Sequence, residues 1–136
     1  MKQCSLKTHQ RIDIVDITAL IRTYLQDISA GDGILTVFCP HTTAGITVNE
    51  NADPDVRRDL SAFLSRTIPP DARYAHSEGN SDAHIKSTLT NSSQQLIVEE
   101  GRVMLGTWQG VYFMEYDGPR SREVWLQFVG DKQSVK

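Results

Sequence analysis

The sequence predicts an α+β domain of mostly antiparallel β-strands with two or three helices. Three observations predict it: amphipathic helical spacing in separate segments, a last third that reads as successive strands, and Gly or Pro turns between those strands. The length of 136 residues is enough for one domain with its own core and too short for two ordinary ones. We therefore expect a single domain over residues 1–136.

The first third of the chain predicts a strand, a helix and a second strand. Residues 2–10 can form the strand. The helix follows because apolar residues recur at the spacing of one helix face, with Asp16 as the N-cap and residues 31–33 (Gly-Asp-Gly) as its end and turn. That face consists of Ile17, Leu20, Ile21, Tyr24, Leu25 and Ile28. Residues 34–39 then form a short apolar strand, in which Cys39 is expected as a small buried side chain.

The next strand, about residues 41–50, has two different faces. Ala44, Ile46 and Val48 share the apolar one. The opposite face is polar or small and carries no Lys, Glu or Arg, which is unusual for a solvent-facing strand. It consists of His41, Thr43, Gly45, Thr47 and Asn49. We interpret this face as the lining of a wet cavity; an ordinary solvent-facing side is the alternative.

Two further helices are predicted. Asp53 and Pro54 are a typical helix start, an N-cap followed by Pro at the first helical position. Four apolar residues are then spaced to make a buried stripe: Val56, Leu60, Phe63 and Leu64. Residues 69–70 (Pro-Pro) end this segment, and residues 70–79 read as a loop. The third helix starts near Ser81 or Asp82, carries Ile85 and Leu89, and ends at Asn91, which tolerates a left-handed backbone.

The last third predicts four strands, at residues 95–98, 103–106, 111–116 and 123–129. Gly101 and Gly118-Pro119 supply turns between them.

Composition and charge exclude several classes of protein. A formal charge of −3 argues against non-specific nucleic-acid binding. No apolar run approaches the roughly 20 residues that span a bilayer, and the N-terminus lacks a signal-peptide segment. We therefore expect a cytoplasmic protein with neither a nucleic-acid nor a membrane partner.

Three of the four histidines indicate a metal or acid–base site. His41, His76 and His84 fall on a strand, a loop and a helix start, and together they can supply three nitrogen ligands with open positions. His84 lies in a first helical turn, where the helix dipole favours the neutral imidazole that a metal requires. Asp82 can cap the helix or bind the cation, and Glu78 can orient a histidine. The alternative for each residue is a purely structural role.

Hydroxyl and basic side chains near turns indicate an anion site. The candidates are Thr42, Thr43, Lys86, Arg120, Arg57, Ser92 and Ser93. The glycines around Trp108 allow a ligand to approach the backbone closely. Solvated surface charges, and a core or interface role for Trp108, are the alternatives. Glu50, Glu78 and Glu115 are candidate general bases, although Glu50 is more simply explained as a strand end.

Six blocks in order resemble the YjbQ family, also called UPF0047, from about residue 9 to residue 130. They are His41-Thr42-Thr43-Ala44; Asn49-Glu50-Asn51-Ala52-Asp53-Pro54-Asp55-Val56; Tyr74-x-His76; Glu78 to Lys86; Gly106-Thr107-Trp108-Gln109-Gly110; and Asp117-Gly118-Pro119-Arg120. One departure is Asn91, where the family is expected to have Gly.

The resemblance implies an α+β sandwich, a homotrimer and a metal-associated pocket that contains the histidines. It also implies a secondary thiamine-phosphate synthase, which joins a hydroxymethylpyrimidine diphosphate to a thiazole phosphate and releases diphosphate. On this hypothesis His84, Asp82 and Glu78 are catalytic. A divalent ion, Zn or Mg, is held by His41, His76 and His84. The phosphorylated substrate is bound by Thr42, Thr43, Lys86, Arg120 and Trp108. The alternatives are a metal-dependent hydrolase of a small anionic metabolite and a non-enzymatic trimeric metal- or anion-binding protein.

Overall fold

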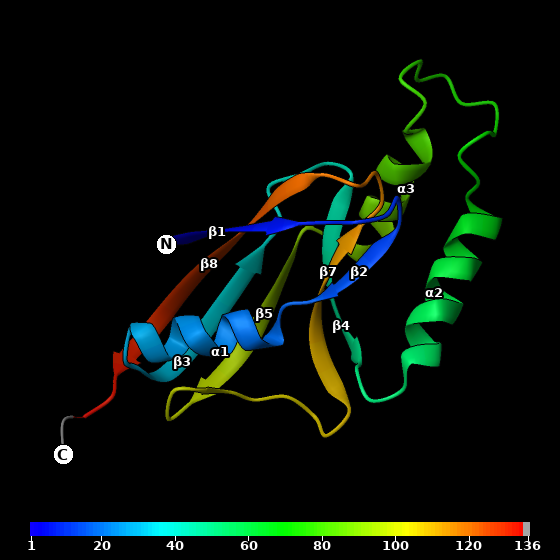
Figure 1. Cartoon of the computed structure of the whole chain (residues 1–136). Helices are drawn as coiled ribbons and strands as arrows, with labels where there is room; N and C mark the ends of the chain where they lie inside the picture. Colours follow the sequence, from blue (N-terminus) through cyan, green and yellow to red (C-terminus); the bar gives the residue numbers. More distant parts are fainter. Residues whose placement is uncertain (135–136) are drawn as a thin grey trace.

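Two antiparallel sheets form the fold, with three helices beside them (Figure 1). The computed structural model describes residues 1–134, so the last two residues of the expected domain lie outside the described part. The elements are β1 (Lys2–Lys7), β2 (Asp13–Asp16), α1 (Thr18–Asp27), β3 (Ala30–Phe38), β4 (Ala44–Glu50), α2 (Pro54–Thr67), α3 (Ser81–Thr90), β5 (Ser93–Glu99), β6 (Arg102–Val103), β7 (Gln109–Glu115) and β8 (Ser121–Lys132). The predicted α+β class is confirmed.

The main core lies between the two sheets. The larger sheet has the order β1-β8-β3-β5-β6, and the smaller one has the order β2-β7-β4. Alternate residues of β3, such as Leu35 and Val37, point inward and are fully buried with Val124 and Leu126 of β8. Cys39 belongs to the same core, as the sequence predicted. Three of the four strands predicted in the last third are confirmed as β5, β7 and β8. The strand predicted at residues 103–106 is reduced to the two residues of β6, because the chain leaves the sheet after Val103. β2 is an additional strand that the sequence did not indicate.

Helix α1 follows its predicted apolar pattern, but its predicted end is wrong. Ile21, Tyr24 and Leu25 are buried in the main core. The N-cap residue is Ile17 and not the predicted Asp16, although Asp16 Oδ1 accepts a hydrogen bond from the N–H of Thr18, the first helical residue (2.9 Å). The turn, however, falls at Ser29, which has φ 51°, and residues 31–33 already belong to β3. Gly33 is needed there because a Cβ would lie 2.3 Å from the Val129 carbonyl oxygen of the neighbouring strand.

Strand β4 has the predicted apolar face but begins at Ala44, later than predicted. Of the residues predicted to line a wet cavity, His41 and Thr43 precede the strand and line a polar hollow, whereas the strand itself is covered at Gly45. Gly45 is buried against α3, and a Cβ there would lie 2.5 Å from Thr90 Oγ1. Ser87 of α3 also donates a hydrogen bond to the Ala44 carbonyl (2.7 Å). Helix α3 therefore covers this side of the smaller sheet, over a second cluster with Tyr112, Met114, Tyr116 and Ala83.

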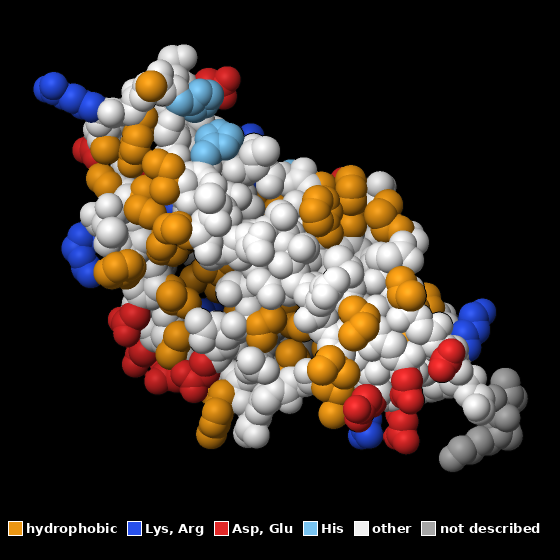
Figure 2. All heavy atoms as spheres, turned by 180° about the vertical axis from the view of Figure 1, so that it is seen from behind, with side chains coloured by type: hydrophobic (Ala, Val, Ile, Leu, Met, Phe, Trp, Pro, Cys, Tyr) orange, Lys and Arg blue, Asp and Glu red, His pale blue; other side chains and the backbone are white. Residues whose placement is uncertain are grey.

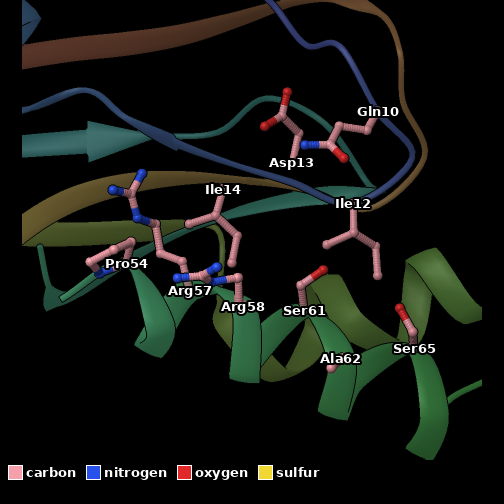
Figure 3. Close-up of a pocket in the computed structure, with 10 residues that line it drawn as sticks. All are labelled: Gln10, Ile12, Asp13, Ile14, Pro54, Arg57, Arg58, Ser61, Ala62 and Ser65. Carbon is pink, nitrogen blue, oxygen red and sulfur yellow. The ribbon is translucent and has the colours of Figure 1, made fainter.

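Helix α2 starts as predicted but does not bury its apolar stripe. Asp53 Oδ1 accepts from the Asp55 N–H, and Pro54 is the first helical residue. No residue of α2 is buried, and Phe63 is 54% exposed. The helix lies at the side of the fold (Figure 1). An open groove of about 720 Å³ separates it from β2, with Ile12 and Ile14 on one wall and Ser61 on the other (Figure 3).

Helix α3 ends at Asn91, whose φ of 73° agrees with the prediction. Its residues Ile85 and Leu89 are exposed, because the helix contacts the sheet through Ala83 and Ser87 instead. Among the residues described, no helix is long and apolar enough to cross a membrane.

Candidate functional site

A polar hollow of about 390 Å³ lies where β4 and α3 begin and the turn before β8 passes. Six of its lining residues were predicted from sequence: His41, Thr42, Thr43, Glu78, His84 and Arg120. Three further polar residues complete it: Asn80, Asp117 and Arg122. The fold thus brings together residues that are far apart in the chain, and we call this hollow the polar pocket.

His41 is fixed by the backbone of β8. The pairing of β3 with β8 ends at Phe38 and Trp125, so β8 continues without β3 beside it. His41 Nε2 accepts the hydrogen bond of the Glu123 N–H (2.9 Å), which assigns the ring proton to Nδ1. Burial, and then the nearby Arg122 guanidinium, lower the pKa of His41. The imidazole is therefore neutral, and its Nε2 lone pair is already used.

His84 and His76 lie side by side at the rim of the polar pocket. Their ring centroids are 5.4 Å apart in an edge-to-face arrangement. Glu78 Oε2 lies 3.6 Å from His76 Nε2. The loop before α3 thus carries a carboxylate and an imidazole to the first turn of the helix, although His76 itself does not line the hollow.

These donors do not fit the predicted three-histidine metal site. Within residues 1–134, no group of three or more His, Cys, Asp or Glu side chains is arranged to hold a metal ion. The Nε2 lone pair of His41 already accepts the Glu123 N–H of β8. Of the predicted residues, only His76, His84 and Glu78 lie near one another. The divalent cofactor, Zn or Mg, stays a prediction.

Asp82 and Lys86 form a buried ion pair behind the polar pocket. Lys86 is 1% exposed, and its Nζ lies 2.7 Å from Asp82 Oδ2. Arg11 Nη2 donates to the other carboxylate oxygen of Asp82 (2.9 Å). Burial opposes ionisation of Asp82, but the hydrogen bond and charge of Lys86, together with Arg11, outweigh it and hold the pKa of Asp82 below its usual value.

Neither member of this pair lines the polar pocket. The expected phosphate contact of Lys86 and the expected ligand role of Asp82 are thus replaced, in this chain, by the (i, i+4) pair on α3.

A second buried ion pair supports the floor of the polar pocket. Glu115, in β7, is fully buried, and both of its oxygens bond the Arg122 guanidinium of β8. Thr8 Oγ1 donates to Glu115 Oε1 (2.7 Å), and Arg122 Nη2 donates to Thr43 Oγ1 (2.8 Å). Burial opposes the charge of Glu115, but its bonds to Arg122 and Thr8 hold its pKa below the usual value.

Glu115, named above as a candidate general base, is therefore ionised, and its carboxylate oxygens are already bonded to Arg122 and Thr8. Sequence reasoning missed Arg122 altogether. The available signal was that Arg122 alternates in phase with the apolar residues Val124 and Leu126 of the same strand.

Asp117 organises the remaining side of the polar pocket. Arg120 donates to it through Nη2 (2.9 Å), and Asn80 Nδ2 donates to the same oxygen (3.0 Å). Arg11 Nη1 lies 3.6 Å from the second oxygen. The Asn80 Oδ1 atom is buried and lacks a partner within the described residues. The turn at residues 117–120 is thereby tied to the start of α3.

Trp108 lies away from the polar pocket. It is 62% exposed in the turn before β7, and its carbonyl accepts the Asn51 N–H just after β4 ends. The polar pocket lies at the other end of β4, which begins at Ala44. Seven strand residues separate the two ends by roughly 20 Å. Within one chain, therefore, Trp108 does not line the polar pocket, and its predicted role in substrate binding gains no support from the geometry.

Comparison with known proteins identifies the family. The profile of the family described as UPF0047 protein YjbQ-like matches residues 2–131. A UPF0047 protein from Methanocaldococcus jannaschii is 51% identical over 127 residues, covering 93% of this chain and 92% of the relative. YugU from Bacillus subtilis, also a UPF0047 protein, is 45% identical over 131 residues, covering 96% and 99%.

Solved structures of similar proteins support the same family assignment. A crystal structure of an uncharacterized YjbQ/UPF0047-family protein from Clostridium acetobutylicum has a TM-score of 0.92 at 51% identity, covering 95% of this chain and all of the other. A hypothetical protein from Aeropyrum pernix has a TM-score of 0.91 at 35% identity, covering 96% and 98%.

These comparisons correct the expected activity. The matching proteins are described as UPF0047 proteins, as uncharacterized or as hypothetical, and nothing in them indicates thiamine-phosphate synthesis. The expectation of a thiamine-phosphate synthase is therefore contradicted. The expectation of a transferase depended on that reaction and is withdrawn as well. What sequence and structure together establish is that this chain belongs to the YjbQ (UPF0047) family.

Proposed function

We propose that the polar pocket binds a small phosphorylated metabolite. The observation that carries this proposal is the state of Arg122, a buried guanidinium in the pocket wall. Its Nε and Nη2 groups are held by Glu115 and Thr43, whereas Nη1 makes no hydrogen bond within residues 1–134. A guanidinium fixed on one edge presents the other as a rigid donor for phosphate or carboxylate oxygens.

Neighbouring donors support the same ligand. Arg120 uses Nε and Nη2 on Asp117, so its Nη1 edge is also left for a ligand. Thr42 is exposed, and Thr43 Oγ1 accepts from Arg122, so its own proton can point elsewhere. Helix α3 begins at the same wall, and a helix N-terminus favours an anion.

The charge balance of the polar pocket limits the affinity expected for inorganic phosphate. Each arginine of the polar pocket already faces a carboxylate, Glu115 or Asp117. Binding of a bare anion therefore relies on hydrogen bonds rather than on a net positive field. We expect inorganic phosphate to bind with a Kd of about 1 mM, and an organic phosphate to bind more tightly because its remainder can contact His84 and Glu78.

Titration calorimetry with inorganic phosphate and with glycerol 3-phosphate tests the proposal. Arg120→Ala should weaken both affinities by about ten- to a hundredfold, the value of a charge-assisted hydrogen bond. Arg102→Ala is the matched control, because Arg102 is an exposed arginine on β6 that pairs with Glu100 outside the polar pocket. Circular dichroism of each variant checks that the fold is retained.

Two results would contradict the proposal: no saturable heat with either ligand, or equal affinity in the wild type and in Arg120→Ala. The homotrimer and the divalent cation implied by the family resemblance stay predictions, as does a cytoplasmic location.

A further inference from the structure

The charged side chains in and around the polar pocket balance one another. Two arginines and two carboxylates line it: Arg120, Arg122, Glu78 and Asp117. Directly behind them, Glu115 pairs with Arg122, and Arg11 Nη1 lies 3.6 Å from Asp117. These side chains carry as many positive as negative charges. A phosphate dianion bound by itself would therefore leave about two uncompensated negative charges in the site.

One carboxylate of the polar pocket has no cationic side chain as its partner. Glu78 Oε2 lies 3.6 Å from His76 Nε2, and no lysine or arginine in residues 1–134 is within ion-pair distance of it. Glu115 and Asp117, by contrast, each pair with an arginine. Figure 2 shows histidine side chains next to one another at the surface, with acidic side chains beside them, at the end of the molecule that carries the loop before α3. Glu78 can therefore bind a positive group of a ligand.

Glu78 and the arginines of the polar pocket belong to different elements. Arg120 lies in the turn before β8, whereas Glu78 lies in the loop before α3. The two elements are held together two residues after Glu78, where Asn80 Nδ2 donates to Asp117 Oδ2 (3.0 Å). The same Asp117 oxygen accepts from Arg120 Nη2 (2.9 Å). The polar pocket thus has cationic donors on one wall and a carboxylate on another, which suits a ligand with two separated charges.

We propose, on the basis of the function proposed above, that the phosphorylated metabolite also carries an ammonium group, as aminoalkyl phosphates do. Its phosphate contacts the Nη1 edges of Arg120 and Arg122, and its ammonium contacts Glu78. Such a ligand brings one positive charge of its own, so about one excess negative charge remains instead of two. An ammonium is a compact charge with three donors and no acceptor. A hydroxyl in the same place could form a hydrogen bond but would compensate no charge.

Calorimetric titration with two matched ligands tests this ligand class. O-Phosphoethanolamine and 2-hydroxyethyl phosphate differ only in the ammonium that replaces a hydroxyl. EDTA in the buffer excludes a metal ion that could bridge phosphate and Glu78. The wild type should bind O-phosphoethanolamine about three- to fivefold more tightly, the value of one solvent-exposed ion pair. Glu78→Gln should remove this preference and change the affinity for 2-hydroxyethyl phosphate little. The Glu78 side chain is exposed, so this variant should keep the wild-type circular dichroism spectrum.

Glu99→Gln is the matched control, because it neutralises an exposed carboxylate at the end of β5, outside the polar pocket. It should keep the wild-type preference. Equal affinities of the two ligands in the wild type would overturn the ammonium site and leave the proposed phosphate site intact. A preference that persists in Glu78→Gln, or disappears in Glu99→Gln, would have the same consequence. Binding of neither ligand would instead refute the phosphate site itself, and the ammonium site with it.

Discussion

The ion pair under the polar pocket gives the most quantitative test of this structure. Glu115→Gln keeps the size of a side chain that is fully buried and removes only its charge. The wild-type carboxylate accepts from Thr8 Oγ1 (2.7 Å), from Arg122 Nε (2.8 Å) and from the backbone N–H of Tyr116 (3.1 Å). In the variant, an amide NH₂ replaces one acceptor oxygen, and Arg122 keeps its buried positive charge without a counter-charge.

The magnitude follows from this imbalance. Removing one partner of a buried ion pair costs about 3–5 kcal/mol, because the other charge stays desolvated. For a domain of this size the whole free energy of unfolding is about 5–15 kcal/mol. Glu115→Gln should therefore remove about a fifth or more of the free energy of unfolding. Arg122→Met combined with Glu115→Gln should be less destabilised than Glu115→Gln alone, because the double variant buries no unpaired charge.

The assay is urea unfolding followed by circular dichroism, with all variants at one protein concentration. The two single variants and the double variant form a cycle that isolates the pair. Glu100→Gln, on an exposed carboxylate paired with Arg102, is the control and should change the free energy of unfolding by less than about 0.5 kcal/mol. A loss below about 1 kcal/mol in Glu115→Gln, or a coupling energy of zero, would refute the reasoning.

Three further predictions concern other parts of the chain. The folded-state pKa values of Asp82 and Glu115 lie below their usual values, so the stability from these groups is complete above about pH 5 and is lost as the pH falls below about 4. Urea unfolding at pH 7, 5, 4 and 3 measures this, and a flat profile would contradict it. Gly45→Ala should destabilise by about 1–3 kcal/mol, because its Cβ would lie 2.5 Å from Thr90 Oγ1; a neutral effect in thermal unfolding would show that α3 does not pack this closely. Trp108→Ala should leave phosphate affinity unchanged in calorimetry, since Trp108 lies at the far end of β4 from the polar pocket; a tenfold loss would place it in the site.

Sequence patterns succeeded where the determining interactions are local. Asp53 and Pro54 start α2, and Asn91 ends α3, because cap chemistry depends on a few neighbouring residues. The same is true of the apolar face of β4, which strand alternation alone specifies. Glycine was misread at residues 31–33, because a glycine required by a close neighbouring strand has the same sequence signature as one in a turn.

The candidate site was only partly predictable for the same reason. His41, Thr42, Thr43, Glu78, His84 and Arg120 were predicted as site residues, and the polar pocket contains all of them. The sequence could not predict that the Lys86 side chain is buried against Asp82, because the helical spacing is the same whether this side chain points into the protein or toward a ligand. It also gave α2 a buried stripe, although periodicity cannot say whether another element lies against the apolar face.

Composition, caps and alternation thus determined the α+β class, most of the helices and strands, and the residue types of the site. Only the tertiary structure decided which charges meet: Thr8 and Glu115 are 107 positions apart, and Arg122 and Thr43 are 79 apart. Such pairs depend on strand register and on the packing of the two sheets, and no local pattern in the chain encodes them.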